Sequence, residues 1–575
     1  MTRNLGVLSA KPYDVVIVGG GIYGACAAWE AALRGLSVAL VDRDDFGHAT
    51  SANSQKIVHG GLRYLQSFDV PRMRQSIRER RTWLRIAPHL VSPLPCLMPT
   101  SGVGTRSRAA MSLALRANDL ISWDRHRGLE DVAQRIPPCR MVSREACLRM
   151  APGLDGHGVT GGALWYDGQI YDSERLTLAF ILSASKAGAD VANYVEVTGF
   201  LKAGSAIAGV KATDVLTGRT LEIRSRVVLN TSGPWAERLV RPLNGRPPHR
   251  AIPFVKAVNL VTRPLGLEVA LGIESRSAKR QTPGLLFITP WRNRSIIGTA
   301  YFRYDGEPER CAVTEEEIEA FLDEIKGAFP SAHLRRGDVS FVHMGLLPAA
   351  HHAATTLEKR ALVLDHQRVD GLNGLISILG IKYTTARDVA EHAVELAVRQ
   401  LARRTAPRGM SRTTPLEGGA MPDREAFLKA ARQDRRVDLS ASTTAHLVFS
   451  YGTRYLDVLA FLNEHPALGE PVTRTEPVIK AQLIHAVRRE MAVTLGDVIF
   501  RRIGLGAVGH PGIEVLRQCA KLLESELGWD GARTTKEIDQ VEATFTRHGA
   551  RDTSGSSRRV VREEPAMSTL HGGIV

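Results

Sequence analysis

A strand–turn–helix–strand pattern at residues 13–45 constrains the fold more than any other part of the chain. Residues 15–18 are an apolar run typical of a buried parallel strand, and a glycine-rich turn joins them to an alanine-rich helix at residues 25–34. A second strand, residues 36–41, leads directly to Asp42. This succession of elements predicts a Rossmann-like domain that binds a dinucleotide.

Three glycines in the turn have separate roles in binding such a ligand. Gly19 permits the tight turn, Gly21 lets the backbone approach a diphosphate, and Gly24 lets the helix pack closely on the strand. The N-terminus of the helix then faces the diphosphate, and the carboxylate of Asp42 can accept a hydrogen bond from a ribose hydroxyl. The motif by itself does not distinguish FAD from NAD.

Length and charge narrow the class of protein further. A chain of 575 residues is too long for one core and should contain about three domains of roughly 100–200 residues each. No apolar run is long enough to span a membrane and no signal peptide is present, so we expect a cytoplasmic protein. The net charge of +15 favours anionic partners, but no nucleic-acid-binding motif accompanies it, so nucleic acid is not an expected partner.

The six cysteines are scattered and form no C-x-x-C pair. This spacing indicates a reducing compartment, with neither a metal site nor a disulfide framework. Cys139 and Cys147 lie near each other in sequence, but we interpret them as ordinary small apolar residues.

The segment ATSANSQKIVHGGLRYL, residues 49–65, resembles the block A-T-S-x-x-S-x-K-x-I/V-H-G-G-x-R-Y-L of FAD-dependent, respiratory-type glycerol-3-phosphate dehydrogenases. Small and hydroxylated residues allow such a segment to pass close to a flavin and to bond its phosphate or ring oxygens. The resemblance implies FAD as the cofactor. The residues that it places against FAD are Thr50, Ser51, Ser54, Lys56, Gly60, Gly61 and Leu62.

Further blocks follow in the order of the same family over most of the chain. RVVLNTSGPWA at residues 226–236 resembles V-x-N-A-T-G-P-W, and LGIKYTTAR at residues 379–387 resembles F-G-G-K-L-T-T-x-R. Residues 290–291 and 295–299 resemble two strands of the family, I-P-W and S-I-I-G-T. The resemblance adds further FAD-contacting residues: Gly233, Trp235, Gly380, Lys382, Tyr383 and Thr384.

These patterns predict an α/β chain, α+β in part, with three units. They are an FAD-binding domain of the glutathione-reductase/D-amino-acid-oxidase type, a sheet-based substrate domain and a helical C-terminal domain. We expect residues 483–500 to form one long amphipathic helix. The predicted boundaries are 12–85, 165–235 and 345–400 for the FAD-binding domain, 86–164 and 236–344 for the substrate domain, 425–548 for the helical domain, and 549–575 for a disordered tail.

Oxidation of an alcohol by a flavin requires a base for the hydroxyl proton and cations for an anionic substrate. His59 is a candidate base, although a histidine that only bonds backbone near the cofactor is an equal alternative. Arg63 and Tyr64 occupy positions where the family contacts substrate. Arg360 corresponds to a second substrate-binding arginine of the family, and Lys382 to a residue that contacts flavin or substrate.

Two positions depart from the family at the substrate pocket. The family sequence G-V-R-P is GLLP here, so Leu347 replaces an arginine, and Asn259 replaces a histidine of K-G-S-H. Losing one charged hydrogen bond should cost about 1.5–3 kcal/mol. His343, His351 and His352 lie near the lost arginine in sequence and are candidates to compensate for it.

The resemblance implies oxidation of sn-glycerol 3-phosphate, or of a related phosphorylated alcohol, to the ketone by hydride transfer to flavin N5, with a quinone as electron acceptor. The alternatives are an FAD-dependent oxidase or dehydrogenase of another alcohol or amine, with a retuned pocket, and a flavin-binding protein without catalysis. The six arginines of residues 69–90 and the amphipathic residues 111–123 suggest peripheral membrane contact, with a solvated helix and a core helix as alternatives. A homodimer is also compatible with the resemblance.

Overall fold

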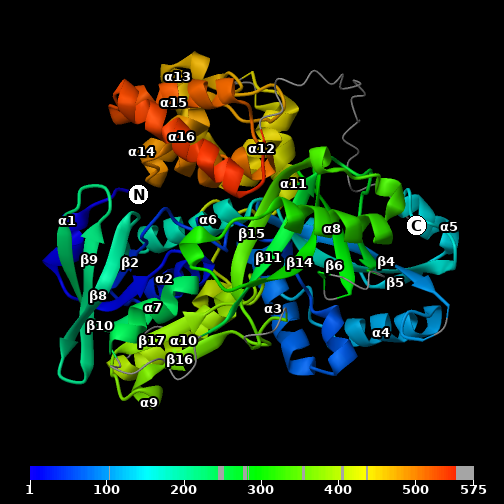
Figure 1. Ribbon diagram of the computed structural model, residues 1–575, viewed down its shortest axis with the longest axis horizontal. Helices are drawn as coiled ribbons and strands as arrows, with labels where there is room; N and C mark the ends of the chain where they lie inside the picture. The colour runs from blue at the N-terminus through cyan, green and yellow to red at the C-terminus, as the bar shows by residue number, and fades with distance from the viewer. Residues whose placement is uncertain are drawn as a thin grey trace.

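A computed structural model describes residues 1–102, 104–243, 252–275, 281–282, 284–351, 356–402, 407–434 and 438–551. Two large β-sheets lie side by side, and a group of C-terminal helices covers them from above in the view of Figure 1. The structure therefore has the mixed helix and sheet composition, α/β and in part α+β, that the sequence predicts.

The first sheet contains eight strands, ordered β16–β17–β10–β1–β2–β7, with β8 and β9 as an antiparallel extension of β10. The pairs that β1 makes with β2 and with β10 are parallel, and every residue of β1 is buried. Two apolar faces therefore need cover, which explains the uninterrupted apolar run in the sequence. The strands are β1 (Tyr13–Val18), β2 (Val38–Val41), β7 (Asp190–Ala192), β8 (Val195–Ala203), β9 (Ala206–Asp214), β10 (Thr220–Asn230), β16 (Leu362–Asp365) and β17 (Leu375–Leu379).

Helices cover one face of this sheet, and the β8–β9 extension covers the other. The covering helices are α2 (Ile22–Leu33), α6 (Ser173–Lys186) and α10 (Ala386–Leu401). The predicted strand, glycine turn, helix and second strand are confirmed as β1, α2 and β2. The helix begins at Ile22, before the predicted residue 25, because the glycine turn itself supplies its first residues.

The second sheet contains nine strands, ordered β15–β11–β14–β13–β12–β4–β6–β3, with β5 paired to β6. Helix α8 (Glu315–Ala328) packs its apolar side on this sheet. The β-type runs predicted before and after residue 292 are confirmed as β13 and β14. The strands are β3 (Ile57–Val58), β4 (Val91–Ser101), β5 (Arg140–Val142), β6 (Val159–Ile170), β11 (Phe254–Thr262), β12 (Ala270–Glu274), β13 (Leu285–Trp291), β14 (Arg294–Tyr304) and β15 (Val339–Pro348).

The C-terminal helices form the third part of the structure and pack on the second sheet through one shared apolar cluster. They are α11 (Arg424–Gln433), α12 (Ala441–Tyr451), α13 (Tyr455–Glu464), α14 (Lys480–Glu490), α15 (Ile513–Leu527) and α16 (Gly531–Arg547). The remaining helices are α1 (Leu5–Ala10), α3 (Val70–Ile86), α4 (Arg108–Ile121), α5 (Arg144–Met150), α7 (Ala236–Val240) and α9 (His366–Val369). Within the described ranges, no helix is both long enough and apolar enough to cross a membrane.

The single long helix predicted for residues 483–500 is wrong. Met491 adopts a left-handed φ of 60°, and a separate helical turn begins at Asp497. The carboxylate of Asp497 accepts hydrogen bonds from the N–H groups of Val493 (2.9 Å) and Thr494 (3.1 Å). Apolar periodicity continues across this break, but the side-chain cap gives the interrupted backbone its partners.

The predicted domain boundaries stay a prediction. All strands of the first sheet lie in segments predicted for the FAD-binding domain, whereas β3 and the end of β6 come from those segments and join the second sheet. The predicted tail starts at 549, but Ala550 is only 5% exposed and packs with the C-terminal helices, whereas Arg551 is exposed. The rest of that tail, 552–575, lies outside the described residues.

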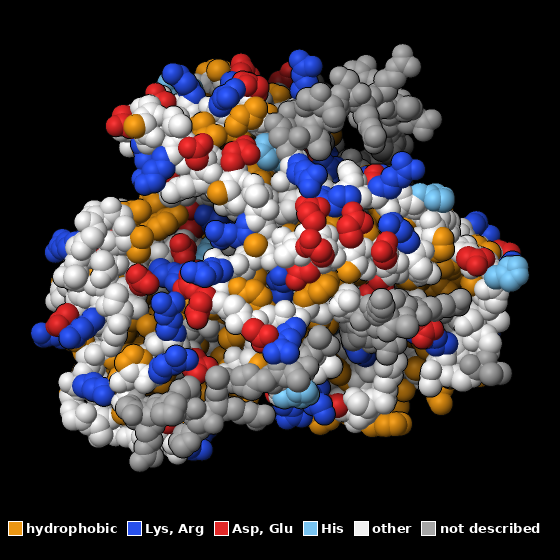
Figure 2. Space-filling model, in the orientation of Figure 1, with side chains coloured by type: hydrophobic (Ala, Val, Ile, Leu, Met, Phe, Trp, Pro, Cys, Tyr) orange, Lys and Arg blue, Asp and Glu red, His pale blue; other side chains and the backbone are white. Residues whose placement is uncertain are grey.

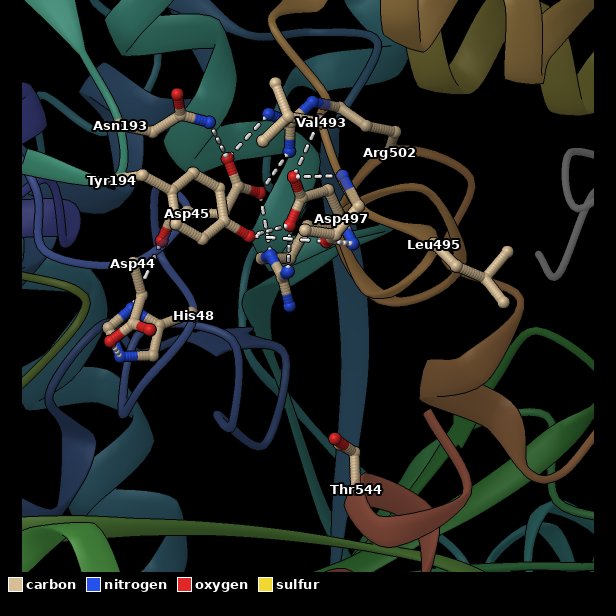
Figure 3. A network of polar contacts seen from close by, with 12 residues as sticks. Asp44, Asp45, His48, Asn193, Tyr194, Val493, Leu495, Asp497, Arg502 and Thr544 are labelled. Atoms are coloured by element: carbon tan, nitrogen blue, oxygen red, sulfur yellow. Dashed lines mark hydrogen bonds and ion pairs between the residues drawn. The ribbon is translucent and has the colours of Figure 1, made fainter. Parts of the chain in front are cut away.

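A buried polar network joins the helical part to the segment that follows β2 (Figure 3). Asp45, fully buried, accepts hydrogen bonds from both terminal nitrogens of Arg502 (2.6 and 2.8 Å) and from Nε of Arg501 (2.7 Å). Asn193 donates a fourth hydrogen bond (2.9 Å) to the same carboxylate. The network holds Asp45 three residues beyond Asp42, so it attaches the helical part to the nucleotide turn.

Candidate active site

The glycine turn between β1 and α2 has the shape that a dinucleotide requires. Gly19 has a left-handed φ of 101°, and a Cβ atom there would lie 2.7 Å from the carbonyl oxygen of Thr231. A Cβ on Gly24 would lie 1.9 Å from the carbonyl oxygen of Gly19, whereas one on Gly21 would meet only Ser51 Oγ, at 3.1 Å. The turn is therefore closed toward the protein and open at Gly21, where backbone can approach a diphosphate.

Asp42 lies beside this turn at the end of β2. It is buried, and its Oδ2 accepts a hydrogen bond from the N–H of Gly20 (2.6 Å). Burial raises the pKa of Asp42 to about 6, against the opposing effects of His48 and of the backbone hydrogen bonds. The residues of the turn and of β2 thus fit the diphosphate and ribose of FAD.

The hydroxylated segment at residues 50–54 runs between the nucleotide turn and the second sheet. Ser51 Oγ accepts a hydrogen bond from the N–H of Ile22 (2.9 Å) at the start of α2. Thr50 Oγ1 donates to the carbonyl oxygen of Leu346 (3.1 Å) on β15, and Ser54 Oγ accepts from the N–H of Lys56 (3.2 Å). These hydrogen bonds attach the segment to the nucleotide turn on one side and to β15 of the second sheet on the other.

The side chains of Lys56 and Tyr383 both reach α6. The buried ammonium of Lys56 donates to the carbonyl oxygen of Ala52 (2.8 Å), to Ser173 Oγ (2.7 Å) and to Glu174 (2.7 Å), which uses all three of its hydrogens. The hydroxyl of Tyr383 donates to the carbonyl oxygen of Ser173 (3.0 Å). The two side chains therefore hold the segments predicted to contact FAD, residues 50–62 and 380–384, against α6.

The turn at residues 380–385 packs directly on the nucleotide motif. A Cβ on Gly380 would lie 1.9 Å from the ring of Tyr23, whose hydroxyl donates to the carbonyl oxygen of Lys382 (2.8 Å). Thr384 Oγ1 accepts a hydrogen bond from the N–H of His59 (3.1 Å). Segments more than 300 residues apart in sequence therefore meet at the start of α10.

The other predicted cofactor residues lie in two further glycine-containing turns, at residues 60–62 and 233–235. Gly233 has a left-handed φ of 59°. Trp235 donates from Nε1 to Glu309 (2.7 Å) and stacks 4.5 Å below the guanidinium of Arg43. Gly61 is also left-handed (φ 83°) and is followed directly by half-buried Leu62. The preceding residue is Gly60, where a Cβ atom would clash with a buried arginine side chain.

That arginine, Arg80, belongs to a group that positions His59. Nδ1 of His59 lies 3.2 Å from Oδ2 of Asp167, whose other oxygen accepts from the N–H of Gly60 (2.6 Å) and from Arg80 (3.3 Å). Burial raises the pKa of Asp167, but the hydrogen bond and charge of His59 and the charge of Arg80 lower it overall. An ionised Asp167 keeps the proton on Nδ1, which leaves Nε2 of the half-exposed His59 as a free proton acceptor.

A pocket of about 320 Å³ is lined by three of the predicted catalytic residues, Tyr64, Arg360 and Lys382, whereas His59, Asp167 and Arg80 are not among its lining residues. Lys382 Nζ donates a hydrogen bond to the hydroxyl of Tyr64 and lies 4.5 Å from the centre of its ring. Burial, and then the charges of Arg72 and Arg63, lower the pKa of Lys382 to about 7. We call this the cation pocket, since five of the side chains around it are Arg72, Arg78, Lys359, Arg360 and Lys382.

The two substituted positions lie on neighbouring strands of the second sheet. Asn259 on β11 is buried and accepts from Thr299 Oγ1 (2.8 Å), while half-buried Leu347 lies on β15. His343, the partner of Asn259 across the strands, is 1% exposed, and its burial holds its pKa well below the usual value. A neutral His343 does not replace a lost cation. His351 is exposed, and His352 lies outside the described residues.

Sequence reasoning missed Asp167, Arg80 and Arg72. The two arginines lie in the basic run of residues 69–90. The local sequence there does not distinguish an arginine that is buried or lines a pocket from one that is solvated. Asp167 is one carboxylate within β6, and only strand pairing brings it to His59. A single acidic residue inside an otherwise uncharged strand was the one available signal.

Comparison with known proteins agrees with this architecture. Residues 14–386 match the family described as FAD dependent oxidoreductase, and residues 410–534 match the C-terminal domain of alpha-glycerophosphate oxidase. A glycerol-3-phosphate dehydrogenase of Synechocystis sp. is 34% identical over 94% of this chain and 97% of its own length. Glycerol-3-phosphate dehydrogenase 2 of Mycobacterium bovis is 30% identical over 92% of this chain and 88% of its own.

A solved structure extends the likeness to three dimensions. The crystal structure of the glycerol-3-phosphate dehydrogenase from Bacillus halodurans, complexed with FAD, covers 95% of this chain and 97% of its own, with a TM-score of 0.73 and 25% identity. Two family matches in sequence order, relatives at 30–34% identity over nearly all of the chain and this shared fold lead to one assignment. The chain belongs to the FAD-dependent glycerol-3-phosphate dehydrogenase family.

Proposed function

We propose that this protein oxidises sn-glycerol 3-phosphate to dihydroxyacetone phosphate with FAD as its cofactor. The observation that carries the proposal is the cation pocket, whose Lys382 lies two residues from Thr384, the hydrogen-bond partner of the backbone N–H of His59. FAD supplies the hydride acceptor when it is bound. Membership of the family and the names of the relatives support the same substrate.

His59 is the proposed base. Asp167 holds Nδ1 protonated, so Nε2 accepts the hydroxyl proton of the substrate as hydride leaves carbon. Arg80 keeps Asp167 ionised and oriented. Of the two interpretations of His59 that the sequence left open, this arrangement favours the base, because the side chain has a carboxylate partner and keeps one nitrogen free.

The cation pocket is the proposed site for the substrate phosphate. Arg360 is 71% exposed without substrate and faces the opening, whereas Lys382 is half-buried against Tyr64. A guanidinium and an ammonium together recognise a phosphate by bidentate and point-charge contacts. The exposed Arg63 adds positive potential, since its charge acts on both Lys382 and Tyr64.

We propose that FAD is bound tightly but without a covalent bond, because the sequence shows no attachment signature. The direct contacts are expected from the glycine turn with Asp42, from the segment at residues 50–54, from Gly60–Leu62, and from the turns at 233–235 and 380–384. Lys56 and Tyr383 support these segments from behind. Acid denaturation should release FAD into the supernatant; flavin that stays with the precipitated chain would contradict this.

Anaerobic bleaching of the bound flavin tests the reaction directly. Glycerol 3-phosphate should bleach it in a single turnover, while glycerol, which lacks the phosphate, should act at least about tenfold more weakly. Bleaching by an unphosphorylated alcohol or an amine alone would support the retuned pocket at Leu347 and Asn259 instead. A flavin that no substrate of the panel reduces would support a protein without catalysis.

We further propose a quinone acceptor and contact with the inner face of the cell membrane from the cytoplasm. Apolar side chains gather at the lower edge of the molecule, below α4 (Figure 2). Leu113 and Leu120 of α4, Trp123 just after it and Phe68 are 71–85% exposed, while Met111 and Leu115 of α4 are buried. This is the pattern of an interfacial helix. The basic run of α3 contributes less than its sequence suggests, since Arg80 is buried and paired.

Flotation with anionic liposomes tests the membrane contact. Leu120→Ser with Trp123→Ser should lower the bound fraction several-fold and leave flavin bleaching by glycerol 3-phosphate unchanged, because both side chains are exposed and neither lines the cation pocket. Binding that is equal in wild type and variant would exclude α4 as the membrane-facing helix.

A further inference from the structure

The cation pocket carries more positive charge than the two predicted residues Arg360 and Lys382 explain. Its charged lining is Arg72, Arg78, Lys359, Arg360 and Lys382, against the single carboxylate of Asp388. That carboxylate is engaged elsewhere, because it accepts from Gln75 (2.7 Å) and lies 3.6 Å from Arg387. Among the described lining residues, five cationic side chains thus accompany one carboxylate, and that carboxylate already has other partners.

Arg72 is the best-positioned of these additional cations. It lies in the first turn of α3, and its guanidinium stacks 4.5 Å from the ring centre of Tyr64, the same ring that Lys382 approaches to 4.5 Å. The side chain is 16% exposed, against 71% for Arg360, so it is already ordered. Arg63, which the sequence favoured, is not among the described residues that line the pocket.

One carboxylate connects the two arginines. Asp69 caps α3 by accepting from the N–H of Arg72 (3.2 Å), and its Oδ2 lies 3.6 Å from Nη1 of the same residue. Its Oδ1 lies 3.9 Å from Nη2 of Arg360. Asp69 thus brings the two arginines to one side of the pocket. Its single negative charge does not balance the three positive charges of Arg72, Arg360 and Lys382. Two guanidinium groups and an ammonium around one small cavity repel one another. An anion bound between them would offset this repulsion.

We propose that Arg72 is a substrate-binding residue, and that it provides the third positive charge for the phosphate together with Arg360 and Lys382. The inference rests on the proposed function and names a group beyond it. The pKa of Lys382, lowered by burial and then by Arg72, agrees with a pocket in which these charges are close.

Binding of inorganic phosphate to the oxidised holoenzyme, measured by calorimetry, tests Arg72 without turnover. Arg72→Gln should weaken phosphate binding about 10- to 100-fold and raise KM for glycerol 3-phosphate by a similar factor, with kcat changed less. Arg72→Lys should recover part of the affinity. Arg85→Gln is the matched control, because Arg85 is an exposed arginine of the same helix outside the pocket and its loss changes the net charge equally.

The outcomes separate this inference from the proposed function. Unchanged phosphate affinity and KM in Arg72→Gln, in a chain whose wild type oxidises glycerol 3-phosphate, would overturn the role of Arg72 alone. Equal weakening by Arg85→Gln would also overturn it, because the effect would then be one of general charge. A wild type that binds phosphate through Arg72 but does not oxidise glycerol 3-phosphate would instead refute the proposed function. If Arg72→Gln does not retain FAD, Arg72→Lys and Arg72→Met decide by the same titration.

Discussion

The network around Asp45 leads to a prediction about how the helical part supports the cofactor (Figure 3). Asp45→Asn keeps the shape of the side chain and removes its charge. Arg502 then loses a bidentate partner at 2.6 and 2.8 Å and keeps only the carbonyl oxygen of Glu490, at 3.0 and 3.2 Å. Arg501 retains Asp497 at 2.6 Å. One buried guanidinium thus loses its direct ion-pair partner.

The magnitude follows from the burial of the pair. Arg502 and Asp45 have no exposed side-chain surface, and removing one partner of such a pair costs about 3–5 kcal/mol. Asp44→Asn is the control: Asp44 lies next in sequence but is 42% exposed, so losing its ion pair should cost less than about 1 kcal/mol. The charge of Arg502, followed by that of Arg501, outweighs burial and holds the pKa of Asp45 well below its usual range. This contribution is present above the unfolded pKa of about 4 and is lost only as pH falls through the lower folded value.

Two measurements check the prediction. Thermal unfolding followed by flavin fluorescence should show a clearly lower midpoint for Asp45→Asn than for Asp44→Asn. FAD should also dissociate faster on dilution, because Asp45 follows Asp42 by three residues and positions the nucleotide segment. If Asp45→Asn unfolds and releases FAD like the wild type, the argument from buried charge is refuted.

Four further predictions concern the reaction. Arg360→Ala should lower kcat/KM by about 2 kcal/mol at constant FAD content, and unchanged kinetics would remove Arg360 from the site. Asp167→Asn should lower kcat by about 10²–10⁴ and alter its pH profile, since the imidazole loses the partner that fixes its tautomer; a purely structural role would instead appear as lost FAD. Sulfate, a dianion at every pH used, should bind most tightly below pH 7 and more weakly above it, because deprotonation of Lys382 near its pKa of about 7 removes a positive charge. In Lys382→Met the affinity for sulfate should not change with pH over this range. Leu347→Arg with Asn259→His should not raise kcat/KM on glycerol 3-phosphate, and a large gain over a nearly inactive wild type would show a retuned pocket.

Local patterns in the sequence were sufficient for the nucleotide half of the site. The turn at Gly19–Gly24 depends on residues that are neighbours in the chain, and its demand for glycine is steric, so the motif predicts the structure directly. Residues 49–65 and 379–387 are equally local, and the resemblance to the family predicted that both approach the flavin. Their contact through His59 and Thr384 agrees with that expectation.

Other features depend on particular side-chain contacts, local or distant, which the periodicity of apolar residues does not reveal. The helix predicted across Met491 is interrupted because the side chain of Asp497 caps the backbone, although the apolar spacing continues. Lys56 looked like a cofactor contact among small polar residues, yet its ammonium is paired with Glu174, 118 residues away.

The sequence by itself determined the fold class, the cofactor and the family, because each depends on short blocks whose residues act together locally. Only the tertiary structure decided which charges form the site. Pairing of β6 with its neighbours brings Asp167 to His59, and the packing of α3 beside the turn at residues 380–385 brings Arg72 to Lys382. Charge acts through space over a few ångströms, and the spacing of residues along a chain does not specify that distance until the chain has folded.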